Sequence, residues 1–202
     1  MRAGRGGDWC ETFAISENHI ALSIGDISGH GIDEYDLMVA VRKVIHDAVL
    51  RGLSPMCALA EANRFLCINH PKKTATALLA FLNTDEQSLI FANAGHPAPL
   101  MANTEKTSFL EFPESDMLLG IDIDAKTKIR IIDVPPSTLL VLYTDGVSEH
   151  RKDAIQGEHE LFDAVTLAYR STSFPKADII EKTMFLSGLN TDDVSILTAF
   201  TE

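Results

Sequence analysis

Residues 19–31 have the sequence HIALSIGDISGHG. The apolar run at residues 19–24 predicts a buried strand, which ends at the turn Gly25-Asp26. From Asp33 to about Arg51, apolar residues recur at spacings of three and four, which predicts an amphipathic helix that ends at Gly52. The sequence therefore begins with a strand, a glycine-rich turn and a long helix, and a carboxylate lies where the strand ends.

The rest of the chain alternates between strands and paired helices. A serine and a proline at residues 54 and 55 have the form of a helix N-cap and a first-turn proline. Because hairpin-length turns join most of the predicted strands, the sheets should be largely antiparallel, with helices covering them. We expect strands at 76–82, 89–93, 100–101, 107–112, 128–134, 139–143 and 194–200, and helices at 55–68, 158–169 and 177–185.

Composition limits the classes of protein that the chain can represent. It has 202 residues, of which 46% are hydrophobic and 23% charged, as in an ordinary globular domain. The net charge of −12 and the lack of a basic stripe argue against nucleic-acid binding and, more weakly, against an anionic membrane surface. No apolar run approaches the roughly 20 residues that span a bilayer, and the polar, glycine-rich start is no secretory signal. Three cysteines without close pairs indicate a reducing compartment, so we expect a cytoplasmic location.

Acidic residues lie at the ends of several predicted strands. Asp8 follows two glycines, Asp26 and Asp145 each end a strand, and the pair Asp192-Asp193 precedes the last one. If they converge, two like charges about 4 Å apart repel by roughly 4 kcal/mol at an effective dielectric of 20. Mg²⁺ and Mn²⁺ prefer oxygen ligands and would remove this repulsion. Two such ions could share a water of lowered pKa that attacks phosphorus, so a two-metal phosphatase site is one interpretation.

The glycines near Asp26 agree with that interpretation. Gly29 and Gly31 flank His30 and leave the backbone free to approach an ion or a phosphate. Backbone carbonyls can also bind hard cations, and the carbonyl of Ile27 is a candidate ligand.

Each feature also has an ordinary structural explanation. An isolated Asp-Gly pair such as residues 145–146 usually marks a turn, and residues 192–193 could cap a loop. His96, like His30, is more often a polar turn residue than a ligand, Asn93 is expected to shape a turn, and Glu149 to be solvated. Spacing alone leaves both interpretations open.

The ordered set of motifs resembles a known family. Together the motifs are similar to the bacterial branch of the PPM/PP2C phosphatases, the SpoIIE/RsbU-like serine phosphatases, over nearly the whole chain. They are Gly6-Gly7-Asp8-Trp9, residues 25–31, Asn93-Ala94-Gly95-His96-Pro97, Leu119-Gly120-Ile121, residues 143–147 and Asp192-Asp193.

The resemblance implies a fold and a metal centre. The fold would be an α+β, four-layer α-β-β-α sandwich of two mainly antiparallel sheets flanked by helices, in one domain over residues 1–202. The centre would hold two Mn²⁺ or Mg²⁺ ions, with Asp26 as the bridge. The implied ligands, which are also the catalytic set, are Asp8, Asp26, Asp145 and Asp192, with the Ile27 carbonyl and, as a weaker candidate, Asp193.

The resemblance also implies partners. The substrate would be a phosphoserine or phosphothreonine protein, such as a STAS-type anti-sigma-factor antagonist. An upstream sensor or response-regulator module would control the domain, and a homodimer is a further possibility.

Three departures from the family pattern are visible. The segment before Asp8 is short, as expected for part of a longer regulatory protein, so an edge strand or regulatory helices could be absent. Cys10 and Glu11 stand where relatives have an aromatic residue and an aspartate. The bulky, acidic residues 32–36 replace small ones and could alter regulation, partner docking or metal affinity.

Other mechanisms fit the sequence less well. A cysteine phosphatase would need Cys57 and Arg64 on a glycine-rich loop, yet the segment between them is predicted to be helical. Residues 122–126 do not match the aspartyl-phosphate motif in their last position. The remaining alternative is a phosphatase-like module that binds a phosphoprotein or another partner with little or no turnover.

Overall fold

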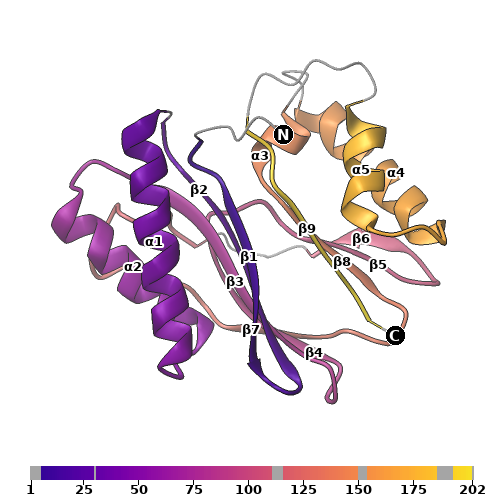
Figure 1. The fold of residues 1–202 in the computed structure, drawn as a ribbon, viewed down its shortest axis with the longest axis horizontal. Coiled ribbons are helices and arrows are strands. Elements are labelled where there is room, and N and C mark those ends of the chain that lie inside the picture. Colours follow the sequence, from indigo (N-terminus) through magenta and orange to yellow (C-terminus); the bar gives the residue numbers. More distant parts are fainter. Residues whose placement is uncertain (1–5, 30, 111–115, 150–153, 186–192, 202) are drawn as a thin grey trace. The chain divides into compact units, whose positions relative to one another are not determined.

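A computed structural model describes residues 6–29, 31–110, 116–149, 154–185 and 193–201. The chain divides into two compact units, which Figure 1 shows together. Unit 1 comprises residues 1–96 and 113–134, and unit 2 comprises residues 97–112 and 135–202. Within the described residues the two units contain two antiparallel sheets and five helices, which confirms the predicted α+β class.

Unit 1 contains a five-stranded antiparallel sheet and two helices. The strands lie in the order β1-β2-β3-β4-β7, so the first four follow the chain as successive neighbours. The elements are β1 (Trp9–Ser16), β2 (His19–Ile27), α1 (Ile32–Leu50), α2 (Pro55–Asn69), β3 (Ala75–Asn83), β4 (Ser88–Ala94) and β7 (Arg130–Asp133).

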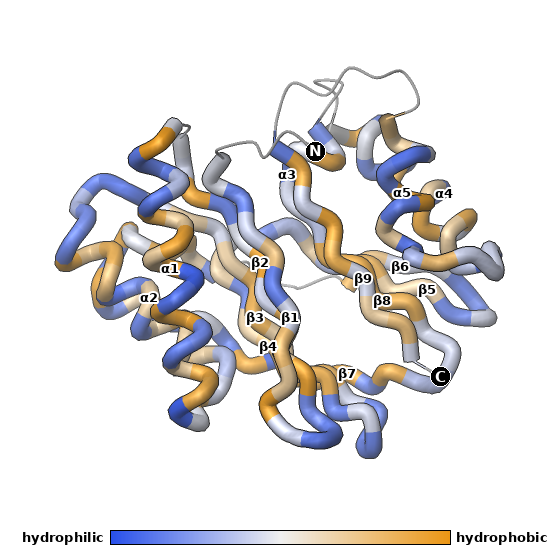
Figure 2. Tube along the Cα trace, in the orientation of Figure 1, coloured by the Kyte–Doolittle hydropathy of each residue, from blue (hydrophilic) through white to orange (hydrophobic). Residues whose placement is uncertain are grey.

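Helices α1 and α2 pack against one face of this sheet. Alternate residues of the strands point toward the helices, as the two-residue period of a strand requires. In Figure 2 hydrophobic and hydrophilic residues alternate along α1, as expected for a helix with one packed side. The core includes the buried residues Trp9, Ala21, Ile27, Val41, Ile45, Leu59, Leu66, Ala77, Leu79 and Ala92.

Unit 2 contains a four-stranded antiparallel sheet in the order β6-β5-β8-β9, with helices packed on it. All five residues of β8 are buried. The elements are β5 (Leu100–Ala102), β6 (Thr107–Phe109), β8 (Leu139–Tyr143), α3 (Asp145–Ser148), α4 (Ala154–Arg170), α5 (Lys176–Met184) and β9 (Ile196–Phe200).

The structure differs from the sequence prediction at four elements. Strand β2 continues through Gly25 and Asp26 to Ile27, where a turn was predicted, because both residues pair with β3. Strand β1 was not predicted, because Glu11 interrupts its apolar alternation; it lies at one edge of the unit 1 sheet. Helix α3 has four residues, too few to produce a periodic pattern. Helix α4 begins before Gly157 rather than after it, and this glycine lets the helix pass close to α3, since a Cβ there would lie 1.6 Å from the Ser148 carbonyl oxygen.

None of the helices formed by the described residues is long and apolar enough to cross a membrane.

Candidate metal centre

The register of β1 and β2 brings Asp8 and Asp26 opposite each other. The pairing includes Trp9 with Gly25, and a 3.2 Å hydrogen bond from the Ile27 amide to the Gly7 carbonyl continues it beyond β1. Asp8 directly precedes β1, and its backbone therefore lies opposite that of Asp26 near the end of β2. Both residues are half-buried. Carboxylate oxygens such as theirs are ligands that a hard divalent cation prefers.

Gly7 leaves space beside two oxygen atoms of the next strand. A Cβ atom at residue 7 would lie 2.7 Å from Oδ1 of Asp26 and 2.5 Å from the carbonyl oxygen of Ile27. Both oxygens therefore lie within 2.7 Å of one point that only glycine leaves open. A carboxylate and a backbone carbonyl directed at a common space are donors that a hard divalent cation prefers. The residues of this cradle fit Mg²⁺ or Mn²⁺.

Strand β3 adds a polar side chain to the same row. Thr76 pairs with Asp26 across the sheet, so the two side chains share a face. Its Oγ1 lies 2.8 Å from Nδ1 of His96, which is buried. The Asn93 side chain accepts from the His96 amide at 2.7 Å and donates to the His96 carbonyl at 2.9 Å, as expected of a residue that shapes a turn. His96 is thereby connected through Thr76 to the row that contains Asp26.

Sequence reasoning overlooked Thr76. Its only signal is a polar residue at the start of an otherwise apolar strand, at a position that faces Asp26 only in the observed register.

The backbone after Ile27 is fixed by Thr74. The Ser28 amide donates to the Thr74 carbonyl at 2.9 Å, and the Ser28 hydroxyl donates to the same oxygen at 3.0 Å. The Thr74 hydroxyl and amide in turn donate to Oγ of Ser28 at 2.9 and 3.3 Å. These four hydrogen bonds hold Ser28, the residue after Ile27. The direction of the Ile27 carbonyl therefore depends on Thr74 as well as on β2. His30, two residues further on, lies outside the described residues.

Unit 2 contains the second group of predicted ligands. Asp145 is exposed in the first turn of α3, and Asp193 is half-buried just before β9. Gly146 permits their close approach, because a Cβ there would lie 2.1 Å from the Asp193 carbonyl oxygen. Thr144 joins the same two segments through Ser195. Its amide donates to the Ser195 carbonyl at 3.1 Å, and its Oγ1 accepts from the Ser195 amide at 2.9 Å.

Asp192 lies outside the described residues. The structure thus collects the predicted ligands that it describes into two groups, Asp8, Asp26 and Ile27 in unit 1 and Asp145 and Asp193 in unit 2. Among the residues that the structure describes, no three His, Cys, Asp or Glu side chains lie together so that they could hold an ion.

The less favoured phosphatase mechanisms find no support in this geometry. Cys57 and Arg64 both lie in α2, so no loop surrounds the thiol. The Asp122 carboxylate accepts from the Asp124 amide at 3.0 Å and closes a local turn.

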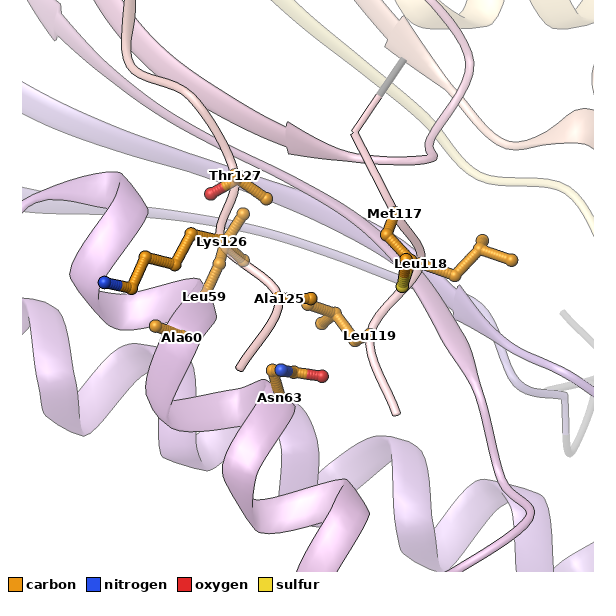
Figure 3. A pocket seen from close by; sticks show the side chains of 9 residues that line it. All are labelled: Leu59, Ala60, Asn63, Met117, Leu118, Leu119, Ala125, Lys126 and Thr127. Carbon is orange, nitrogen blue, oxygen red and sulfur yellow. The ribbon is translucent and has the colours of Figure 1, made fainter. Parts of the chain in front are cut away.

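A small pocket in unit 1 has neither Asp8, Asp26 nor Thr76 in its lining. Figure 3 shows its lining by α2, by residues 117–119 and by residues 125–127. Its volume of about 10 Å³ suits a single water molecule. Asn63 beside it accepts from the Gly120 amide at 2.8 Å and donates to the Asp122 carbonyl at 2.7 Å. This pocket is a packing feature of the loop around Gly120.

Comparison with known proteins assigns the family. The model of the family described as Stage II sporulation protein E (SpoIIE) matches residues 16–201. The chain belongs to the SpoIIE family. The resemblance found in the sequence is thereby confirmed.

Two curated relatives of this SpoIIE-family chain come from Bacillus subtilis (strain 168). Phosphoserine phosphatase RsbP is 26% identical over 148 residues, which cover 71% of this chain and 36% of RsbP. Phosphoserine phosphatase RsbU is 25% identical over 142 residues, which cover 70% of this chain and 42% of RsbU. The match therefore spans well under half the length of either relative.

Solved structures confirm the fold at low sequence identity. The RsbU and RsbW domains of Rv1364c from Mycobacterium tuberculosis superpose with a TM-score of 0.82 at 22% identity, covering 96% of this chain and 54% of that one. The PP2C phosphatase domain of SpoIIE from Bacillus subtilis gives 0.81 at 16% identity, covering 97% and 60%. RsbX in complex with magnesium gives 0.71 at 14% identity, covering 96% and 86%.

Proposed function

We propose that this SpoIIE-family chain is a metal-dependent protein phosphatase that hydrolyses phosphoserine or phosphothreonine on a partner protein. The observation that carries the proposal is the Asp26 carboxylate and the Ile27 carbonyl beside the space that Gly7 leaves open, with Asp8 next to Gly7 in the chain. Carboxylate and carbonyl oxygens gathered around one space are ligands that Mg²⁺ and Mn²⁺ prefer. The relatives named phosphoserine phosphatases support the choice of reaction.

The proposed ligands are those that the resemblance to the family implies. Asp8, Asp26 and the Ile27 carbonyl would hold ions from unit 1, with Asp26 shared between two of them. Asp145, Asp192 and, more weakly, Asp193 would complete the coordination from unit 2. Such ions, when bound, supply a water of lowered pKa and neutralise phosphate oxygens. Mn²⁺ and Mg²⁺ both suit carboxylate ligands, and the magnesium complex of RsbX, a structure of similar fold, supports this choice.

The chain's own residues would act mainly by positioning. Thr76 and His96 limit the orientations open to the Asp26 carboxylate, because they occupy the next place in its row. Ser28 and Thr74 fix the direction of the Ile27 carbonyl. A rigid set of oxygens lowers the reorganisation needed when charge develops on the transferred phosphoryl group.

The wider context of the domain is part of the same proposal. The partner would be a phosphorylated STAS-type anti-sigma-factor antagonist, in keeping with the SpoIIE family. An upstream sensor or response-regulator module would control a single catalytic domain in the cytoplasm, and the match to only 36% of RsbP leaves room for such a module. Dimerisation stays a prediction.

One observation favours a second candidate, a phosphatase-like module that binds its partner with little turnover. The Glu34 carboxylate lies against Gly29 and Gly31, where a side chain at either position would approach it to about 3 Å. Glu34 is ion-paired with Lys73, and a side chain this close to the turn after Ile27 would take up space that a bound ion or phosphate needs in the phosphatase.

Hydrolysis of p-nitrophenyl phosphate separates these two functions. The protein is assayed in EDTA, Mg²⁺ and Mn²⁺, beside Asp26→Asn and the exposed control Asp163→Asn in α4. The phosphatase proposal expects activity that requires metal, vanishes in Asp26→Asn and persists in Asp163→Asn. A folded protein without turnover under any metal would favour the binding module instead.

A further inference from the structure

Glu34 occupies an unusual place at the start of α1. It is the third residue of the helix, it is 9% exposed, and its carboxylate is directed back toward the preceding glycines. A Cβ atom at Gly29 would lie 3.2 Å from its Oε1, and one at Gly31 would lie 3.1 Å from its Oε2. Both glycines have positive φ, 109° and 129°, so the backbone curves around this carboxylate.

Lys73 binds the Glu34 carboxylate. Its Nζ donates to Oε1 of Glu34 in an ion pair between α1 and the residue that precedes Thr74. Thr74 makes the four hydrogen bonds with Ser28 described above. Two neighbouring residues, Lys73 and Thr74, therefore connect to both sides of Gly29.

We infer that the Glu34–Lys73 ion pair is a positioning device that fixes the backbone at Ser28 and Gly29, and thereby the Ile27 carbonyl and Asp26, for metal binding. The inference rests on the proposed function, because it concerns the same ions. In this role each side chain acts through the backbone rather than by binding an ion. Groups that orient metal ligands typically contribute 10–100-fold to metal affinity.

A simple charge effect makes the opposite prediction for Lys73. A cation near the ions repels them, so its removal should strengthen metal binding if only charge mattered. If Lys73 instead holds Glu34 in place, its removal should weaken metal binding. The sign of the change therefore distinguishes positioning from electrostatics.

The test uses Lys73→Met and Glu34→Gln, with Lys72→Met as the matched control. Lys72 is the adjacent, exposed residue, and its substitution changes the net charge by the same amount. Mn²⁺ affinity is measured by titration calorimetry on the whole chain. Hydrogen exchange of the amides at residues 28–34 is measured separately in EDTA, where it does not depend on the proposed function.

We expect Lys73→Met and Glu34→Gln each to raise the Kd for Mn²⁺ about 10-fold and to speed exchange at residues 28–34, with Lys72→Met close to wild type. The double variant should lose no more than either single one, because the pair acts as a unit. Equal or tighter Mn²⁺ binding in Lys73→Met, with unchanged exchange, would overturn the inference. If the wild type itself binds no Mn²⁺, the proposed function fails, and the exchange measurement alone decides whether the pair positions the backbone.

Discussion

Gly7→Ala is the substitution that the geometry of the cradle predicts most sharply. The new Cβ would lie 2.5 Å from the Ile27 carbonyl oxygen and 2.7 Å from Oδ1 of Asp26, both well inside van der Waals contact. The backbone at residue 7 needs no positive φ, so the effect comes from lost space rather than from strain. Overpacking of this kind costs about 1–3 kcal/mol, and each kcal/mol lowers the melting temperature by about 2–4 °C in a domain of this size.

The same substitution should also remove the effect of metal on stability. A ligand present at 100 times its Kd stabilises the folded state by about 2.7 kcal/mol, which appears as a rise in melting temperature when Mn²⁺ replaces EDTA. Because alanine displaces the two oxygens that line the cradle, we expect this rise to be largely lost.

Gly52→Ala provides the control for Gly7→Ala. Gly52 follows α1 with φ of +85° and has no atom within 4 Å of its Cβ position. Alanine there should cost about 1–2 kcal/mol through backbone strain, yet leave the Mn²⁺-dependent rise intact. If Gly7→Ala keeps the full rise, the cradle is not a metal site and the reasoning is refuted.

Three further predictions concern stability. Gly25→Ala would place a Cβ 2.2 Å from the ring of Trp9, so we expect a loss of about 1–3 kcal/mol and a changed fluorescence spectrum of the single tryptophan; an unaltered spectrum would contradict this packing. Asn63→Ala removes the acceptor of the Gly120 amide and should lower the free energy of unfolding, measured in urea, by about 1–3 kcal/mol. An unchanged free energy of unfolding would show that the loop does not depend on this bond. Burial, and then the nearby Glu158 carboxylate, raise the pKa of Tyr143 above its usual value. The folded state therefore holds the Tyr143 proton more tightly than the unfolded state does. The stability that this supplies is complete below about pH 10 and is lost as pH rises further. The free energy of unfolding of Tyr143→Phe should accordingly depend less on pH above 10 than that of the wild type. Equal slopes in the two proteins would contradict this prediction.

The sequence predicted the elements better than it predicted their register. Strand β2 follows from its apolar run, although it includes Gly25 and Asp26 where a turn was predicted, and α1 follows from its three-and-four spacing. The pairing of Asp8 with Asp26 depends on an irregularity between Ala14 and Ser16 that shifts the β1 register. A one-residue shift moves a side chain to the other face of a sheet. No local pattern announces this irregularity, so the facing carboxylates could be expected only from the family resemblance.

Contacts between residues far apart in the chain could not be predicted from the sequence either. The ion pair between Glu34 and Lys73 and the bond between Thr76 and His96 join residues from different elements. Composition and periodicity describe a residue's own neighbourhood, whereas these pairs depend on how strands and helices pack. The acidic residues after Gly31 were visible as a departure from the family, but only the structure gives Glu34 a partner.

The most direct test of the account is the number of Mn²⁺ ions bound per chain, measured by electron paramagnetic resonance titration. The wild type should bind two, and both Asp8→Asn in unit 1 and Asp145→Asn in unit 2 should lose at least one, while Asp163→Asn keeps both. If Asp145→Asn binds Mn²⁺ as the wild type does, the two groups of aspartates do not form one centre, and the proposed mechanism is wrong.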